Sequence, residues 1–113
     1  MKRDDSFYLK HILNAILKIE KYTKEISQAD FKRSDLIQDG QVRQIEIIGE
    51  ATKHLSAEFR SKNAAIPWKD IAGMRDKLIH EYFGVDLEIL WRVVRKDIPT
   101  VKRAIRQLSS EID

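Results

Sequence analysis

Ionisable side chains cluster between Gly73 and Gly84, where the sequence is GMRDKLIHEYFG. Arg75, Asp76 and His80 are the members of this cluster whose types and spacing could do chemistry. If the segment is helical, Asp76 and His80 are neighbours on one face, because they are four residues apart, and the carboxylate can fix the imidazole tautomer. Arg75 lies five residues before His80, about 140° around an ideal helix, so both side chains can border one groove. The spacing therefore predicts a histidine that exchanges protons near neutral pH beside a permanent positive charge.

Cleavage of an RNA phosphodiester bond is the chemistry that suits these groups. An imidazole can take the proton of a ribose 2′-hydroxyl or return a proton to the leaving 5′ oxygen. A guanidinium can bind the phosphate and stabilise the extra negative charge of its transition state. The ribose supplies its own nucleophile, so the sequence predicts a reaction that needs no metal ion. His11, His54 and His80 are scattered along the chain, which disfavours a metal site; a pair of ligands from Asp76 and His80 is the weaker alternative.

The same three residues also fit a structural role. An arginine, an aspartate and a histidine near the end of an amphipathic helix are common as an ion-paired surface and a C-terminal cap. From the spacing alone, this structural interpretation is the more frequent one, and catalysis is the alternative.

A basic run extends from Arg92 to Arg106, with six basic residues and Asp97 as its one acidic residue. The run has a local charge of +5, although the whole chain carries only +3. Such a run is usually a solvated helix face, and a surface that faces phosphates is the second interpretation.

Amphipathic helices are expected to position these residues, because apolar residues recur with helical spacing along nearly the whole chain. The predicted helices cover residues 5–27, 39–59, 67–82 and the stretch after Asp86, which is expected to cap the last of them. A short turn or helix is expected at 31–37, with Asp30 and Ser34 as caps. Pro99 interrupts the last helix or starts a new segment. Such helices can bury their apolar faces only against each other. The sequence therefore predicts an all-α, antiparallel four- to five-helix bundle in which no strand is required.

Two glycines make specific predictions about this scaffold. Gly49 costs about 1 kcal/mol relative to alanine inside a helix, so its presence predicts the close approach of a neighbouring backbone. Gly84 follows the predicted 67–82 helix, where a residue in the left-handed conformation usually ends a helix. Trp68 and Trp91 are expected in the core rather than as platforms for stacking bases, and residues 61–65 are expected to form a loop.

Length and composition fit one soluble domain that spans residues 1–113. Of these residues, 42% are hydrophobic and 35% are charged, which suffices for one core beneath a charged surface. The absence of cysteine excludes disulfides, zinc ribbons and thiol catalysis. No apolar stretch approaches the roughly 20 residues that a membrane-spanning helix needs. We also expect no signal peptide, and therefore a cytoplasmic protein.

The segment from Arg75 to His80 fits the R-x4-6-H motif of HEPN domains, and its extension to Tyr82 matches the R-x4-H-x-Y form typical of HepT-like toxins. Three further segments resemble this family: IEIIGEA at 45–51, IPW at 66–68 and YFGVD at 82–86. The likeness extends over nearly the whole chain, and the motif shows no departure from the family pattern.

The resemblance implies an all-α HEPN fold and a metal-independent endoribonuclease without a cofactor, which acts as the toxin of a type II toxin–antitoxin pair. It implies that Arg75 and His80 are catalytic and that Asp76, the polar residue after the arginine, supports them. Glu50 is implied near the cleft, although a buried or capping carboxylate would explain it nearly as well. Two further candidate contacts to RNA are Lys77 and Arg43.

Two partners besides RNA follow from the same resemblance. HepT-like proteins form homodimers that join two copies of the motif at a cleft, which would supply the two histidines needed for acid and base roles. The family's usual antitoxin is MntA, a minimal nucleotidyltransferase, and the pair can form a larger oligomer. In such pairs the antitoxin transfers AMP to the motif tyrosine, here Tyr82, and the added phosphates would crowd the groove and pair with Arg75. Without the resemblance, Tyr82 would be interpreted as an aromatic residue that covers a helix end.

Two other functions stay open as alternatives. One is a non-catalytic helical adaptor that binds a nucleotidyltransferase and presents a substrate to it. The other is a dimerising bundle whose basic last helix binds nucleic acid through phosphates alone, with a steep dependence on salt. The intact motif favours the ribonuclease over both.

Overall fold

Helices make up nearly all of the fold, which the computed structural model describes over residues 5–80 and 84–112. The helices are α1 (Asp5–Thr23), α2 (Gln28–Arg33), α3 (Asp35–His54), α4 (Ala57–Lys62), α5 (Trp68–Ala72), α6 (Met74–Leu78), α7 (Leu87–Arg92), the π-helical turn η1 (Val93–Asp97) and α8 (Ile98–Ile112). Two short strands, β1 (Ile79–His80) and β2 (Gly84–Val85), form an antiparallel ladder between α6 and α7. The predicted all-α class is confirmed, with this two-residue ladder added to it.

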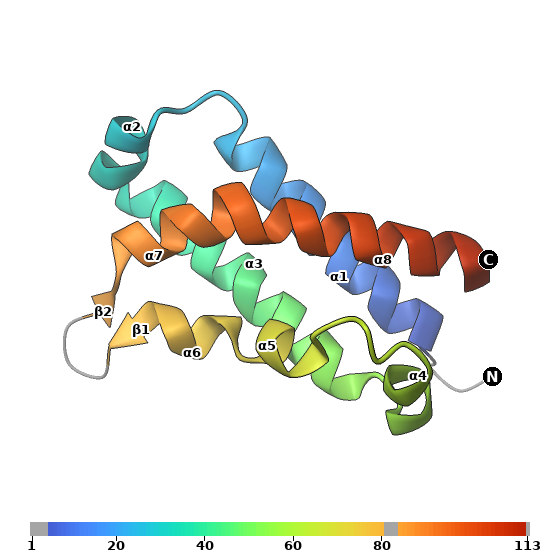
Figure 1. Ribbon diagram of the computed structural model, residues 1–113. Helices are drawn as coiled ribbons and strands as arrows, with labels where there is room; N and C mark the ends of the chain where they lie inside the picture. Colours follow the sequence, from blue (N-terminus) through green and yellow to red (C-terminus); the bar gives the residue numbers. More distant parts are fainter. Residues whose placement is uncertain (1–4, 81–83, 113) are drawn as a thin grey trace.

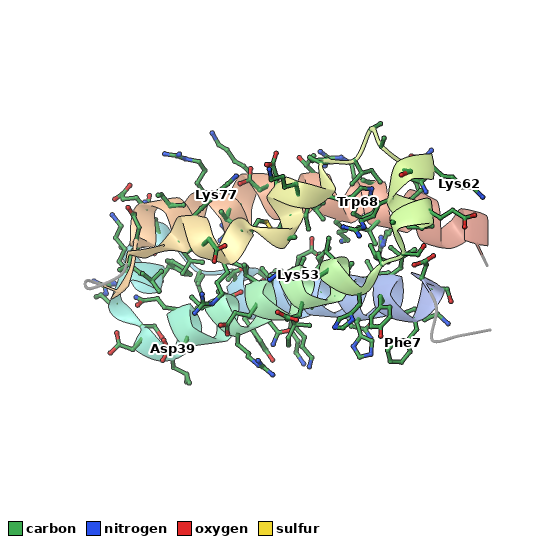
Figure 2. The ribbon with its side chains drawn as sticks, turned by 90° about the horizontal axis from the view of Figure 1, so that it is seen from below. Phe7, Asp39, Lys53, Lys62, Trp68 and Lys77 are labelled. Atoms are coloured by element: carbon green, nitrogen blue, oxygen red, sulfur yellow. The ribbon has the colours of Figure 1, made fainter. Side chains whose placement is uncertain are left out.

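The longer helices pack around one hydrophobic core in the described ranges (Figure 1). α1 packs along α3, α3 contacts α5 and α6, α6 contacts α7, and α8 returns along α1. Figure 2 shows the resulting two layers, with α1 and α3 in one layer and α5, α6 and α8 in the other. None of the helices in the described ranges is both long enough and apolar enough to span a bilayer.

The core faces predicted from helical spacing are confirmed for most residues of the two longest helices, but Tyr22, which the spacing places on the apolar face of α1, is 43% exposed. Their fully buried residues include Leu9, Ile12, Ile16, Ile19, Ile45 and Ile48. Burying one such side chain stabilises the fold by about 1.5–3 kcal/mol relative to leaving it in water. Trp68 is buried as expected, and Trp91 is partly buried against the same core.

Gly49 lies where α3 meets α5, and the predicted close approach of a backbone is confirmed. A Cβ atom added to Gly49 would lie 2.9 Å from the carbonyl oxygen of Ala72. This distance is shorter than real Cβ contacts, so only glycine allows the two helices to come this close. The contact sets the spacing between α3 and the segment that carries Arg75.

α1 ends at Thr23, four residues before its predicted end. Ser27 begins a separate helix, α2, because its side chain accepts a hydrogen bond from a backbone N–H in the first turn. Arg95 holds the connection between the two helices. Its Nη2 donates to the carbonyl oxygen of Thr23 at 2.9 Å and to that of Ile26 at 2.8 Å.

The connection predicted at 31–37 consists of the end of α2 followed directly by the start of α3. Ser34 caps α3 as predicted, since its side chain accepts a backbone hydrogen bond, and α3 begins four residues earlier than expected. The prediction that Asp30 is a cap is wrong, because Asp30 lies inside α2. There the Arg33 side chain, and after it Ser27, hold the pKa of the Asp30 carboxyl below its usual value.

α3 ends at His54, five residues before its predicted end, and α4 follows. Ser56 caps α4 by accepting a backbone hydrogen bond. Asp5, at the start of α1, accepts hydrogen bonds from the N–H of Ser56 at 2.7 Å and from its hydroxyl at 2.9 Å. α4 extends to Lys62, so the loop predicted at 61–65 begins two residues later. A contact between positions 51 residues apart is outside what local spacing can predict.

The helix predicted over 67–82 is divided into α5 and α6 at Gly73, and it ends four residues early at Leu78. The N–H of Asp86 donates to the carbonyl oxygen of Leu78 at 2.8 Å, and β1 pairs with β2. The backbone after Leu78 therefore makes its hydrogen bonds to a neighbouring strand instead of within a helix. Gly84 has a φ of +80°, which confirms its predicted left-handed conformation. Asp86 caps α7, also as predicted.

Pro99 lies in the first turn of α8, directly after η1. A proline lacks the N–H donor and crowds the carbonyl group four residues before it. The wider π-helical turn accommodates this geometry. The helical path from Leu87 therefore continues to Ile112, and Pro99 marks a change of helix type within it.

Candidate functional site

A groove of about 560 Å³ runs across the outer face of α3. Its lining comes from the first half of α1, from α3, and from the α5–α6 segment. Four residues predicted from the sequence line this groove, namely Arg43, Glu50, Arg75 and Asp76. The fold thus brings together candidate residues from two separate predicted helices.

One contact from α3 and one within α6 hold the Arg75 guanidinium in this groove. Its Nε donates to Oε2 of Glu46 at 2.6 Å, and its Nη1 lies 3.8 Å from Oδ1 of Asp76. Both pairs are partly exposed, so each contributes at most about 1 kcal/mol to stability. Their main effect is on geometry. Glu46 fixes the direction of a side chain with five N–H donors and leaves the donors at the Nη atoms for a phosphate.

Glu50 is an exposed residue of the groove, so the alternative of a buried or capping carboxylate is wrong. Its side chain is 68% exposed, and its Oε1 lies 3.7 Å from Nζ of Lys53. Arg43 makes no ion pair or side-chain hydrogen bond with any residue that the structure describes. Its positive charge is therefore available to a ligand in the groove.

Lys77 lies on the other side of α6. It lines a separate cavity of about 230 Å³ together with Asp97 and Thr100. Figure 2 shows Lys77 and Phe7 on opposite sides of the molecule. Residues two apart on a helix point in directions about 200° apart, so α6 cannot direct both Arg75 and Lys77 into one groove.

His80 lies in β1, after the end of α6, and its backbone pairs with that of Gly84. The predicted helix does not extend this far, so the expectation that Asp76 and His80 share one helix face is wrong. The structure describes the backbone of His80 without its side chain, and Tyr82 lies outside the described residues. The position of the imidazole relative to Arg75 stays a prediction.

Among the other residues that line the groove are Glu46 and four residues with aromatic rings, none of which was predicted from the sequence. Glu46 lies four residues before Glu50, and this shared helix face was a signal for it. The other four carry aromatic rings from distant parts of the chain: Phe7, Tyr8, His11 and His54. No local pattern connects the rings of α1 with a ring at the end of α3.

The acidic residues of the groove lie beside basic residues. Glu46 and Asp76 contact Arg75, and Glu50 lies near Lys53. Within the side chains that the structure describes, no group of three or more histidine, aspartate or glutamate residues could hold a metal ion.

Part of the basic run at 92–106 is structural and lies outside the groove. Arg95 holds the end of α1, and its guanidinium carbon lies 4.4 Å from the ring centre of Trp91. Nζ of Lys102 pairs with Oε1 of Glu20 at 2.7 Å. These contacts favour a helix face shared between solvent and α1 over a dedicated surface for phosphates.

Comparison with known proteins identifies relatives over nearly the whole chain. The family model described as "Ribonuclease HepT-like" matches residues 12–108. A "Probable ribonuclease HepT" from Thermococcus cleftensis is 45% identical over 108 residues, which are 96% of this chain and 98% of that protein. A Methanocaldococcus jannaschii protein named "Gamma-glutamylcyclotransferase and putative RNase" is 52% identical over 113 residues.

The chain spans nearly all of the Thermococcus relative but only 51% of the Methanocaldococcus one. No solved structure matches it significantly. The family match covers most of the chain, including the residues that line the groove on α3, α5 and α6. The chain belongs to the HepT-like ribonuclease family.

Proposed function

We propose that this protein is the toxin of a type II toxin–antitoxin pair and acts as a metal-independent endoribonuclease. The observation that carries the proposal is the Arg75 guanidinium, held by Glu46 in an open groove of a chain from a ribonuclease family. Arg43 lines the same groove, so an RNA strand bound there meets a second cation. Glu50 faces the same strand from α3.

In the proposed reaction, Arg75 binds the phosphate of the bond that is cleaved. The ribose 2′-hydroxyl attacks the adjacent phosphorus, the bond to the 5′ oxygen of the next nucleotide breaks, and a 2′,3′-cyclic phosphate and a 5′-hydroxyl form. His80 accepts the 2′-hydroxyl proton or donates a proton to the leaving oxygen. Arg75 stabilises the charge that develops on the phosphate oxygens, and Asp76 restricts the positions of the guanidinium. The ribose is the nucleophile, so no metal-bound water is required.

The proposed active form is a homodimer. One chain supplies one His80, whereas the reaction needs a base for the 2′-hydroxyl and an acid for the leaving oxygen. Two-fold symmetry would bring a second copy of the motif to the same cleft and supply the second group.

The proposed regulator is a nucleotidyltransferase antitoxin of the MntA type, which transfers AMP to Tyr82. Tyr82 follows His80 by two residues, so a modification there lies close to the motif in the chain. Each added phosphate carries negative charge and would compete with RNA for Arg75.

RNA cleavage by the purified protein tests the ribonuclease proposal. We expect the wild type to cleave single-stranded RNA in excess EDTA. Arg75→Ala should lower the rate about 100- to 1,000-fold, the usual effect of removing one donor to a charged transition state. His80→Ala should abolish both cleavage and growth inhibition. Lys77→Ala is the matched control, because Lys77 is a cation of the same helix outside the groove, and it should leave the rate nearly unchanged.

A wild type that leaves every RNA intact, or a His80→Ala variant that cleaves normally, would contradict the proposal. In the first case the adaptor interpretation would replace it, whereas in the second case only the catalytic role of His80 would be withdrawn. A strict requirement for Mg²⁺ would refute the metal-free mechanism while leaving the ribonuclease activity in place.

A further inference from the structure

We propose that four aromatic rings at one end of the groove form a subsite for a nucleobase of single-stranded RNA. We call this cluster the aromatic platform, and it consists of Phe7, Tyr8, His11 and His54. The inference rests on the proposed function in one respect, namely that RNA is the ligand of the groove. It adds a binding site that is separate from the phosphate-binding guanidinium.

The rings of the aromatic platform contact one another in series. The ring centres of His11 and Phe7 are 4.5 Å apart, and Phe7 meets Tyr8 edge to face at 5.1 Å. Tyr8 stacks on His54 at 5.1 Å with only 14° between the ring planes. α1 provides three of the rings and the last turn of α3 provides the fourth, so the fold of both helices is needed to build the series.

Burial in the core accounts for only one member of this cluster, Tyr8, which is partly buried against the core. Phe7 is 38% exposed, and the side chains of His11 and His54 are exposed as well. Figure 2 shows Phe7 on the outer side of α1, away from the layer that contains α5 and α6. Exposed rings of this kind are how proteins bind single-stranded nucleic acid, because every base offers a π face for stacking.

The aromatic platform shares its groove with the phosphate-binding group. Glu46, which holds Arg75, lies eight residues before His54 on α3, or about 12 Å along the helix axis. A phosphate at Arg75 therefore places the base of a neighbouring nucleotide, rather than the base of the reacting ribose, on the rings. Lys53 lines the groove beside His54 and can meet a phosphate between the two sites. The platform would position the strand and contribute to its selection without touching the reacting atoms.

A second copy of this chain is the competing occupant of the aromatic platform. The centre of a protein–protein interface is depleted in charged residues. Here charged side chains of α3 and α6 line the same groove, and Arg43 has no ionic partner in the described part of the chain. A ligand with both rings and phosphates matches this combination better than an apolar subunit contact does.

A double-mutant cycle between the protein and the RNA tests the inference. The probe is a short single-stranded oligonucleotide with 2′-O-methyl riboses, which cannot be cleaved, and its binding is measured by fluorescence anisotropy. Versions with one abasic site at each successive position reveal which base matters. For the wild type we expect one position at which base removal weakens binding about tenfold or more, as for the loss of one stacked base.

Protein variants then identify the rings that bind this base. In Phe7→Ala or His54→Ala, the intact oligonucleotide should bind as weakly as the abasic one, so the abasic penalty disappears. His54→Phe should retain the penalty, because it keeps a ring and removes only the titratable nitrogens. Leu17→Ala is the matched control, since Leu17 is also 38% exposed on α1 but lies outside the groove.

The proposal is overturned if no abasic position weakens binding by the wild type, or if the penalty persists in both alanine variants. Persistence of the penalty together with a lower molecular mass of Phe7→Ala in light scattering would assign the platform to a subunit contact. Because the probe is not cleaved, the two proposals fail separately. Base-dependent binding without RNA cleavage would refute the ribonuclease alone, and cleavage without base-dependent binding would refute the platform alone.

Discussion

Gly49→Ala adds one methyl group at the contact between α3 and α5. The new Cβ atom would lie 2.9 Å from the carbonyl oxygen of Ala72, whereas ordinary contacts begin at 3.4 Å, so the two helices must separate by about 0.5 Å. Alanine is favoured over glycine within a helix by about 1 kcal/mol. Overpacking of a close contact costs about 1–3 kcal/mol. The free energy of unfolding should therefore fall by about 0–2 kcal/mol when the two opposing effects are combined.

Catalysis should respond to this substitution as well as stability. Ala72 is the last residue of α5, and α6 begins two residues later with Met74 and Arg75. A shift of about half an ångström is enough to weaken the 2.6 Å hydrogen bond between Arg75 and Glu46. Misplacement of a catalytic group by about 1 Å can cost up to 100-fold in rate, so we expect a loss of about tenfold here.

The assay combines initial rates of RNA cleavage with urea denaturation of the same preparations. Gly40→Ala is the control, because Gly40 lies in the same helix and its added Cβ atom would meet only Cδ2 of Tyr22 at 3.8 Å. That variant should gain up to about 1 kcal/mol of stability and keep the wild-type rate. If Gly49→Ala behaves like Gly40→Ala in both measurements, the proposed coupling between the helix contact and the site is refuted.

The remaining predictions concern a buried amide and the motif tyrosine. Gln41 is fully buried, and its amide has no hydrogen-bonding partner in the described ranges, so Gln41→Met should raise the free energy of unfolding by about 1–3 kcal/mol in urea denaturation. Gln38→Met should lower it, because the Gln38 amide donates to the carbonyl oxygens of Phe31 and Lys32; equal stabilisation by both would contradict the reasoning. Co-expression with a MntA-type enzyme should increase the mass of the wild type by whole AMP units and leave Tyr82→Phe unmodified. A mass spectrum of the wild type without these additions would rule the modification out.

Helical spacing predicted the parts of the fold that depend on neighbouring turns. The buried faces of α1 and α3, the caps at Ser34 and Asp86, and the conformation of Gly84 all follow from short stretches of sequence. The helix ends were less predictable because distant contacts determine them. Arg95 holds the end of α1 from the other end of the chain, and Asp5 contacts the cap of α4. Neither pairing leaves a periodic signal in the sequence.

The candidate site also contains residues that a continuous motif predicts and residues that only distant contacts bring to it. Arg75 and Asp76 were found because the motif is continuous in the sequence, and Arg43 and Glu50 lie with them in the groove. Glu46 was missed because its partner is 29 residues away. Lys77 was predicted as an RNA contact, but it follows Arg75 by two residues, and helical residues two apart point in nearly opposite directions.

The electrostatic character of the groove follows from its lining. With histidines neutral, the described lining contains three cations and three anions: Arg43, Lys53, Arg75, Glu46, Glu50 and Asp76. A surface that attracts nucleic acid by net charge acts at long range and captures polyanions of any sequence, with a strong dependence on ionic strength. A surface with equal numbers of positive and negative charges exerts little electrostatic attraction on a polyanion beyond a Debye length, which is about 8 Å at physiological ionic strength. In the proposed complex, the groove would therefore bind a strand mainly through fit at short range after collision, and most other polyanions in a crowded cell would not be captured.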